Sequence, residues 1–359
     1  MIGTLFKPPL LAGQVLDGQI TAASENPLAL AHLASLLVSQ GDRARAATLA
    51  QQALEAAPTD TRVQMLALET LRQDVPAWHF DMLCDQARNR AYDAALRRGV
   101  TLGCRVLDIG TGTGLLAMMA ARAGAREVIA CEMNPVIAEL AERIIALNGY
   151  ADRIRVIPKC SSDLDLADVG GRVDVIVSEI ISDNLVSEGV LGVVEDAAAR
   201  LLRPGGRIIP ARGEVRVALA HHPQKFPPRV GSVEGFDLTP FNRLAHSTHG
   251  VRVNDSLLSI GSEAASLFDF DFQSGGPFRS GASVVALEAD GGSVNGVIQW
   301  FRLQLDRDGV YENIPGPSAQ SSWRALFYAF EHSIDLQRGA PVAVHGDRHR
   351  DLLRIWCEG

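Results

Sequence analysis

Residues 106–114 read VLDIGTGTG, and this stretch decides the class of fold. An apolar run that leads into a glycine turn is typical of a buried strand whose carboxyl end meets a ligand. Three glycines stand at alternate positions, Gly110, Gly112 and Gly114. Glycine permits a positive φ and lets a ligand approach the backbone, because it has no Cβ. The spacing is GxGxG rather than GxGxxG, since Leu115 takes the last position of that dinucleotide pattern, so a bound pyrophosphate need not be expected.

Two acidic side chains near this turn indicate a nucleoside ligand. Asp108 ends the apolar run, and Glu132 ends the next one, VIACE. A carboxylate in the position of Glu132 can accept hydrogen bonds from both hydroxyls of a ribose. Strand, glycine turn and second acid together predict an S-adenosylmethionine site, with Asp108, Glu132 and the three glycines as cofactor-binding residues. The alternative is a glycine-rich turn that serves packing alone.

Strand and helix patterns alternate around this motif. Strands are expected at residues 105–109, 127–132, 153–158, 173–179 and 207–215, and helices at 115–124, 135–149 and 191–202. Such a βαβ series predicts a parallel, doubly wound, Rossmann-like sheet. Beyond residue 211, short β-type runs are separated by Gly- and Pro-rich turns, which predicts a second, antiparallel β domain of the barrel or sandwich type.

The first part of the chain has a different pattern. Residues 26–41 and 42–58 have helical apolar spacing, and Asp42 is a good N-cap. They resemble one tetratricopeptide unit of about 34 residues, and a further helix follows. One and a half units do not make a free-standing solenoid, so this segment is expected to dock on its neighbour; a helical hairpin that only adds core is the alternative.

The patterns divide the chain into three parts. They are a tetratricopeptide-like segment at residues 1–74, a methyltransferase domain at 75–210 and a β-barrel substrate domain at 211–359. Residues 223–250 fit neither helix nor strand periodicity and are expected to form an extended excursion from the last domain.

Composition narrows the class of function. The 359 residues include 34 Lys and Arg against 42 Asp and Glu, for a net charge of −8. This argues against a nucleic-acid partner and mildly favours a cationic substrate. Five scattered cysteines without CxxC favour a reducing compartment and no metal site. Neither a signal peptide nor an apolar run of about 18 residues is present, so we expect a cytoplasmic protein without a membrane partner.

Two glutamates mark the candidate chemistry. Glu179 and Glu188 lie nine positions apart in VDVIVSEIISDNLVSEG, just past an expected buried strand. A guanidinium, with a pKa above about 12, stays protonated and is a poor nucleophile. Paired carboxylates can hold it bidentately and orient one terminal nitrogen towards a methyl donor. We therefore predict methyl transfer to a guanidinium with Glu179 and Glu188 as catalytic residues; the alternative is that one or both only cap a turn.

Residues 79–88, HFDMLCDQAR, contain the pattern H-x-x-M-L-x-D-x-x-R. From about residue 77 onwards the chain resembles the protein arginine methyltransferase family. That resemblance implies that Arg88 clamps the methionine carboxylate of the cofactor, and that His79 and Met82 line the cofactor pocket. Ser162 falls where the family often places an acid near the adenine amino group.

The acceptor side shows both a match and departures. The spacing of the two glutamates matches the paired-glutamate loop of the family, and the sequence SSW at residues 321–323 lies where the family has a Thr-His-Trp loop, which implies that Trp323 contacts the substrate. Ser322 replaces the histidine, so no link from Asp85 to a histidine can form. The Tyr-Phe-x-x-Tyr motif of the family is missing before His79. These departures are typical of divergent members and favour monomethylation.

The resemblance leaves the substrate and the partner as expectations. The acceptor is free L-arginine or an arginine in a protein or peptide. A homodimer is expected, because in the family an excursion from the β domain packs against the neighbouring subunit, and residues 223–250 are the segment long enough to do so. Two other functions remain open: an interaction scaffold with a vestigial methyltransferase domain, and a methyltransferase for another small-molecule amine.

Overall fold

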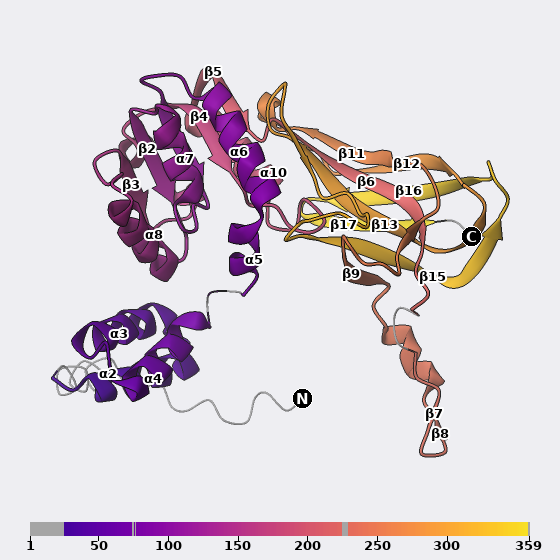
Figure 1. Ribbon diagram of the computed structural model, residues 1–359, viewed down its shortest axis with the longest axis horizontal. Coiled ribbons are helices and arrows are strands. Elements are labelled where there is room, and N and C mark those ends of the chain that lie inside the picture. Colours follow the sequence, from indigo (N-terminus) through magenta and orange to yellow (C-terminus); the bar gives the residue numbers. More distant parts are fainter. Residues whose placement is uncertain (1–24, 74, 76, 225–228, 358–359) are drawn as a thin grey trace. The chain divides into compact units, whose positions relative to one another are not determined.

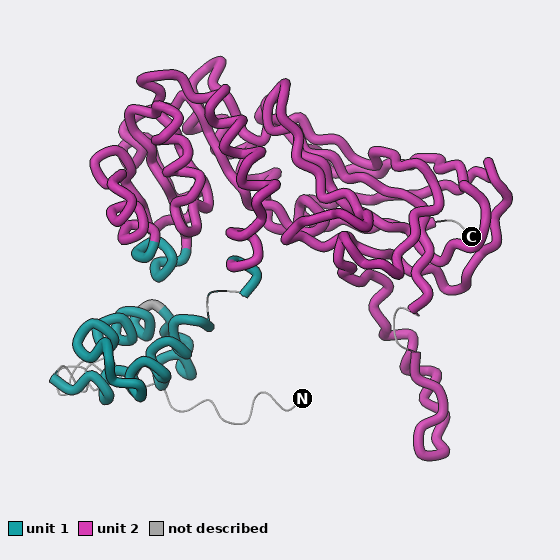
Figure 2. Tube along the Cα trace, viewed as in Figure 1, with its two compact units in different colours: residues 1–79, 134–140 teal, residues 80–133, 141–359 magenta. Residues whose placement is uncertain are grey.

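The computed structural model describes residues 25–73, 75, 77–224 and 229–357. The chain forms two compact units (Figure 2). One contains residues 1–79 with 134–140, and the other contains residues 80–133 and 141–359. Within the described residues, none of the helices has the length and apolar character needed to cross a membrane.

The first unit contains three consecutive helices, α2 (Pro27–Gln40), α3 (Arg43–Ala56) and α4 (Thr61–Arg72). As expected, Asp42 is an N-cap: its carboxylate accepts a hydrogen bond from the backbone of the following helix at 3.3 Å. Gly41 ends α2 with a φ of 87°, which favours glycine. The helices pack through small and aliphatic side chains, among them Ala34, Leu37, Ala46, Ala50, Ala53 and Ala67.

The second unit begins with a parallel sheet of five strands (Figure 1). They are β1 (Arg105–Ile109), β2 (Glu127–Cys131), β3 (Ile154–Ile157), β4 (Val173–Ser178) and β5 (Leu202–Ile209). The order β3-β2-β1-β4-β5 confirms the predicted doubly wound fold. The helices of this unit are α6 (Gln86–Gly99), α7 (Leu115–Ala123), η1 (Ser161–Asp163), α9 (Leu166–Val169) and α10 (Val190–Arg200). Two further helices, α5 (Trp78–Cys84) and α8 (Pro135–Leu147), have residues in both units.

One expected strand is divided in two. The strand predicted at residues 207–215 is interrupted: β5 ends at Ile209, and the next strand begins at Arg212 in another sheet. Pro210 lies between them and has no N–H to donate to a strand ladder, which accounts for the break. The prediction of one continuous strand was therefore wrong, because it ignored this proline.

Antiparallel strands make up the rest of the second unit, as predicted. A seven-stranded sheet contains β6 (Arg212–His221), β9 (Thr248–Arg252), β10 (Ser259–Ile260), β11 (Ala265–Asp271), β13 (Gly292–Gln304), β14 (Val310–Glu312) and β15 (Arg324–Leu336). A three-stranded sheet contains β12 (Gly281–Glu288), β16 (Pro341–His349) and β17 (Leu352–Cys357), and η3 (Phe272–Ser274) follows β11. Trp300 and Phe327 are buried in the core of this part.

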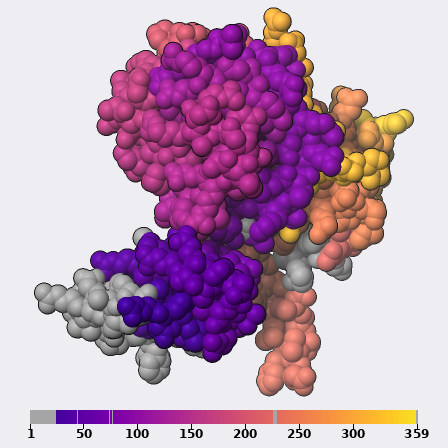
Figure 3. Space-filling model, turned by 60° about the vertical axis from the view of Figure 1, so that its left-hand side comes forward, coloured from indigo at the N-terminus to yellow at the C-terminus, as the bar shows by residue number. Residues whose placement is uncertain are grey.

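A small hairpin stands apart from both sheets. β7 (Ser232–Val233) pairs only with β8 (Phe236–Asp237), and the 3-10 helix η2 (Thr239–Leu244) follows. The hairpin projects as a finger in the ribbon and space-filling views (Figures 1 and 3). It belongs to the stretch expected to form an excursion, of which residues 225–228 lie outside the described part.

Candidate active site

The site lies where the order of the parallel strands reverses. β1 pairs with β2 on one side and with β4 on the other, and in register Ile109 is opposite Ser178. Ligands of open α/β sheets bind outside the carboxyl ends of the strands at such a switch point. The glycine turn follows β1, and Glu179 follows β4 directly. The topology therefore brings the two predicted motifs to the same edge of the sheet.

The three glycines of the turn serve different purposes. Their φ values are 72° at Gly110, 54° at Gly112 and 80° at Gly114, all in the region that favours glycine. A Cβ at Gly110 or Gly114 would lie 2.7 or 2.9 Å from an isoleucine side chain, so both glycines permit close packing. A Cβ at Gly112 would meet no atom within 4 Å. Gly112 instead donates its N–H to Glu132 Oε2 at 3.1 Å, which ties the turn to the end of β2.

Asp108 has an incomplete set of hydrogen bonds. Its side chain is fully buried, and Oδ2 accepts from Thr111 Oγ1 at 2.5 Å. Oδ1 is buried and has no hydrogen-bond partner among the described residues. Burial raises the pKa of Asp108 to about 7. A buried carboxylate oxygen without a partner is costly, and a cationic ligand group such as an ammonium would satisfy it.

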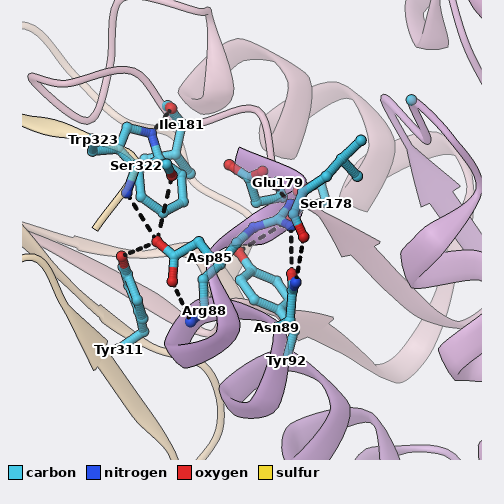
Figure 4. A network of polar contacts seen from close by, with 12 residues as sticks. Asp85, Arg88, Asn89, Tyr92, Ser178, Glu179, Ile181, Tyr311, Ser322 and Trp323 are labelled. Carbon is cyan, nitrogen blue, oxygen red and sulfur yellow. Dashed lines mark hydrogen bonds and ion pairs between the residues drawn. The ribbon is translucent and has the colours of Figure 1, made fainter. Parts of the chain in front are cut away.

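Arg88 lies at the start of α6, where Asp85 caps the helix. Asp85 Oδ1 accepts from the Arg88 N–H at 2.9 Å. The Arg88 guanidinium forms an ion pair with Glu179 and donates to Asn89 Oδ1 at 2.8 Å (Figure 4). The Arg88 and Glu179 side chains are each only 4% exposed. Arg88 Nε is buried without a hydrogen-bond partner among the described residues, so it can still donate to a carboxylate.

The two candidate catalytic glutamates act on each other through their charges. Burial raises the pKa of Glu179 to about 7, the Arg88 charge opposes this rise, and the nearby charge of Glu188 adds to it. Glu188 itself is exposed. The structure thus combines a buried, cation-paired carboxylate with a solvent-facing one in the same loop.

The loop at residues 321–323 contacts the N-cap of α6. Asp85 Oδ2 accepts from the Ser322 N–H at 3.0 Å and from the Tyr311 hydroxyl at 3.0 Å (Figure 4). The Tyr311 hydroxyl also lies 2.8 Å from Ser321 Oγ. Hydroxyl and backbone donors therefore satisfy Asp85 where the resembling family uses a histidine. Tyr311 was not predicted as a site residue, because no motif marks it and it lies 226 positions from Asp85.

Trp323 supports the glutamate loop. Its indole is 9% exposed, packs edge-on against Phe301 with ring centroids 5.1 Å apart, and donates from Nε1 to the Ile181 carbonyl at 2.7 Å. Ile181 is two residues from Glu179. Trp323 also contributes to the wall of a pocket beside α6. Trp323 thus joins the loop before β15 to the glutamate loop.

The other residues predicted to bind the cofactor, His79, Met82 and Ser162, lie on α5 and η1. His79 stacks on Trp78 with ring centroids 3.9 Å apart, and Met82 is half-buried on α5. Ser162 is exposed on η1, and its hydroxyl donates to Asp163 and Cys160. Over the described ranges, no group of three or more His, Cys, Asp or Glu side chains could hold a metal ion.

Known methyltransferases are similar to this chain in sequence. Residues 90–211 match the family model described as ribosomal protein L11 methyltransferase (PrmA). The chain is 38% identical over 277 residues to the arginine N(omega)-methyltransferase of Streptomyces achromogenes subsp. streptozoticus, a match that covers 76% of each chain. It is 34% identical to protein arginine N-methyltransferase 7 of Drosophila grimshawi over 64% of this chain, but the match spans only 36% of that longer relative.

Solved structures give the same fold. A chain of the Trypanosoma brucei PRMT1 enzyme-prozyme heterotetrameric complex with AdoHcy superposes with a TM-score of 0.70 at 26% identity, covering 79% of this chain and 94% of that one. Protein arginine methyltransferase 10 of Arabidopsis thaliana superposes with a TM-score of 0.66 at 21% identity, over 77% of this chain and 90% of that one, which shows the fold alone. The Rossmann-like sheet, the glycine turn and the glutamate loop therefore define an S-adenosylmethionine-dependent methyltransferase. The chain belongs to the arginine N-methyltransferase family, whose methyl donor is S-adenosylmethionine.

Proposed function

We propose that this chain methylates a terminal guanidinium nitrogen of arginine, either free L-arginine or an arginine in a polypeptide, and releases mainly monomethylarginine. Support comes from the ion pair of Glu179 with Arg88, which joins the candidate acceptor side to the candidate donor side through two buried side chains. Glu188 acts on the same carboxylate electrostatically.

The donor side is formed by residues around the glycine turn. S-adenosylmethionine, when bound, supplies an electrophilic methyl group on a sulfonium. Glu132 would accept hydrogen bonds from the ribose hydroxyls, and the free Asp108 Oδ1 would accept from the ammonium group. Arg88 would donate from Nε to the carboxylate. His79, Met82 and Ser162 complete the proposed set of donor contacts.

The acceptor side depends on the two carboxylates. Glu179 and Glu188 would hold the guanidinium and localise its positive charge, so that one terminal nitrogen faces the methyl group. Transfer leaves that nitrogen with one proton too many. Glu179 is suited to accept the proton, because burial raises its pKa to about 7. The Trp323 indole would keep this loop in place through its bond to Ile181.

The proposal of monomethylation rests on the same site. Asp85 is bonded to hydroxyl and backbone donors instead of a histidine, which departs from the arrangement in dimethylating relatives. Mass spectrometry after incubation with S-adenosylmethionine and free L-arginine, an Arg-Gly-rich peptide or neither tests the proposal. We expect monomethylarginine to form first. Dimethylarginine as the main early product with excess acceptor would refute the product assignment, and no methylated guanidine at all would refute the function.

We further propose a homodimer in the cytoplasm. The hairpin β7–β8 and helix η2 carry several exposed apolar side chains, which monomeric proteins rarely concentrate on a projection. All five cysteines are free, as a reducing compartment favours.

A further inference from the structure

A pocket of about 510 Å³ lies beside the N-cap of α6. Its wall comes from the end of α5, from Asp85 and Gln86, from residues 252–254 at the end of β9, and from residues 320–324 before and at the start of β15. The pocket therefore adjoins the hydrogen-bond network around Asp85 that supports the glutamate loop. The side chains of Asp81, Arg252 and Arg324, which also line the pocket, take no part in that network.

Two arginines on one wall of this pocket face each other across a strand pair. Arg252 of β9 is directly opposite Arg324 of β15 in register. Like charges in directly opposite positions destabilise a sheet. Neither guanidinium forms a hydrogen bond or an ion pair with another residue of the described ranges. The Asp183 carboxylate interacts electrostatically with Arg324, so the positive charge that the pair presents to the pocket is only partly compensated.

The pocket lining also carries a negative charge. Asp81 of α5 lines the pocket and is exposed, and its carboxylate has no hydrogen bond or ion pair within the described ranges. The Asp85 carboxylate is different, because it already accepts hydrogen bonds from Arg88, Tyr311 and Ser322. The pocket therefore offers two unpaired guanidinium groups and one unpaired carboxylate.

The arginine pair is connected to the glutamate loop by hydrogen bonds. The Arg324 N–H donates to Asp183 Oδ1 at 2.9 Å, and the preceding Trp323 donates to the Ile181 carbonyl at 2.7 Å. Both acceptors lie within four residues of Glu179. An extended arginine places its α-carboxylate only about 7 Å from its guanidinium carbon, given ordinary bond lengths. A site for an α-carboxylate must therefore lie near the site for the guanidinium, and two residues that line this pocket, Trp323 and Arg324, are hydrogen-bonded to the glutamate loop.

We propose that Arg252 and Arg324 bind the α-carboxylate of the acceptor and that Asp81 binds its α-ammonium group, so that the substrate is a free amino acid. This inference rests on the proposed arginine methylation. An arginine inside a polypeptide has uncharged amides at both positions and cannot satisfy these three side chains. Free L-arginine carries both charges.

The test compares acceptors that lack one charge each. Calorimetry with S-adenosylhomocysteine present, and initial methylation rates, are measured for L-arginine, agmatine (no carboxylate), Nα-acetyl-L-arginine (no ammonium) and a blocked Gly-Arg-Gly peptide. The full-length wild type is compared with R252Q/R324Q and with D81N. R307Q is the matched control, because the Arg307 side chain is 91% exposed in another turn.

We expect L-arginine to bind roughly 10- to 100-fold more tightly than agmatine, as charge-assisted hydrogen bonds to a carboxylate imply. R252Q/R324Q should bring L-arginine down to the affinity of agmatine and leave agmatine unchanged. D81N should weaken L-arginine but not Nα-acetyl-L-arginine, and R307Q should change neither.

Equal use of L-arginine and agmatine by the wild type would overturn the inference and leave arginine methylation intact. A preference for the blocked peptide would also overturn it, as would an equal loss of affinity for every acceptor in R252Q/R324Q. Absence of binding and of transfer for all four guanidines would instead refute the proposed function itself.

Discussion

Glu179 is subject to two opposing influences on its charge. Its side chain is almost fully buried, which raises its pKa to about 7, while the adjacent Arg88 guanidinium stabilises the ionised form and lowers the pKa. A carboxyl group balanced in this way can be ionised to hold a cation and can still accept a proton near neutral pH. Glu188 is exposed, so the two carboxylates differ in burial although both lie in one loop.

The pH dependence of the reaction should follow Glu179. With saturating donor, kcat/KM for arginine should rise with pH through about 7, because only the ionised carboxylate holds the guanidinium. E179Q should lower turnover by roughly 10²- to 10³-fold and remove this rise. E188Q is the matched variant: it should lower turnover similarly but keep the pH profile. Initial rates across about pH 5.5–8.5 measure both effects, and an unchanged profile in E179Q would exclude Glu179 as the titrating group.

Two buried acids should also shape the stability of the unliganded protein. The folded pKa values of Asp108 and Glu179, about 7 each, lie above the ordinary 3.8 and 4.5. Between these values the folded state keeps protons that the unfolded chain has lost, so their contribution lowers the free energy of unfolding as pH rises from about 4 to about 7. Urea unfolding should show a smaller decline over this range for D108N/E179Q than for the wild type. The same slope in both proteins would contradict this assignment.

Three segments are joined in one network at the level of secondary structure. The start of α6 is linked to the glutamate loop through Arg88 and Glu179, and to the loop before β15 through Asp85. The loop before β15 returns to the glutamate loop through Trp323 and Ile181. The links through Asp85 and through Trp323 cross between the parallel and the antiparallel part of the second unit, and the link between Arg88 and Glu179 joins α6 to the glutamate loop within the parallel part. The geometry of the glutamates thus depends on side chains that do not react.

Tyr311 should act as a positioning residue through this network. Y311F removes a hydroxyl that contacts both Asp85 and Ser321, which should cost about 1–2 kcal/mol of unfolding free energy. It should also lower kcat about tenfold, because the start of α6 with Arg88 loses support.

Tyr328 provides the matched control for this substitution. It is also buried, but its hydroxyl has no hydrogen-bond partner among the described residues. Y328F should therefore preserve both kcat and stability more closely. Urea unfolding and steady-state kinetics of the two variants check this, and equal losses in both would show that Tyr311 has only a general packing role.

At the scale of the whole molecule, the projecting hairpin and η2 are the proposed contact with a second copy. Phe236, Phe241 and Leu244 are 71%, 66% and 73% exposed there. Exposing such side chains to water is unfavourable, and burying them in an interface recovers that free energy. A single described chain leaves this apolar surface without a partner.

Light scattering should find a dimer at micromolar concentration for the native chain. The triple variant F236S/F241S/L244S should be a monomer with an unchanged circular dichroism spectrum. L257S is the control, because Leu257 is an exposed apolar residue (53%) on another loop, and it should remain dimeric. A monomeric native protein would remove the proposal.

Local patterns were sufficient for much of the parallel sheet. β1 begins and ends where the apolar run predicted, and the glycine turn and Glu132 follow their strands as expected. The periodicity of apolar residues and the residue preferences of turns extend over only a few positions, so both can be recognised in the sequence. The break at Pro210 was missed although its cause is equally local, because the flanking residues have strong strand propensity.

The partners of the site side chains required the folded molecule. The sequence alone indicated that Glu179, Glu188 and Arg88 belong to the site, but not that Arg88 pairs with Glu179. It also gave no reason to connect Tyr311 with Asp85. A motif is recognised by residue types at short spacing, and both can be seen in the sequence itself. Whether Arg88 meets Glu179 across 91 positions depends on how α6 packs beside the parallel sheet. Whether Tyr311 meets Asp85 across 226 positions depends on how the parallel and antiparallel parts of the second unit pack, and no local pattern encodes either contact.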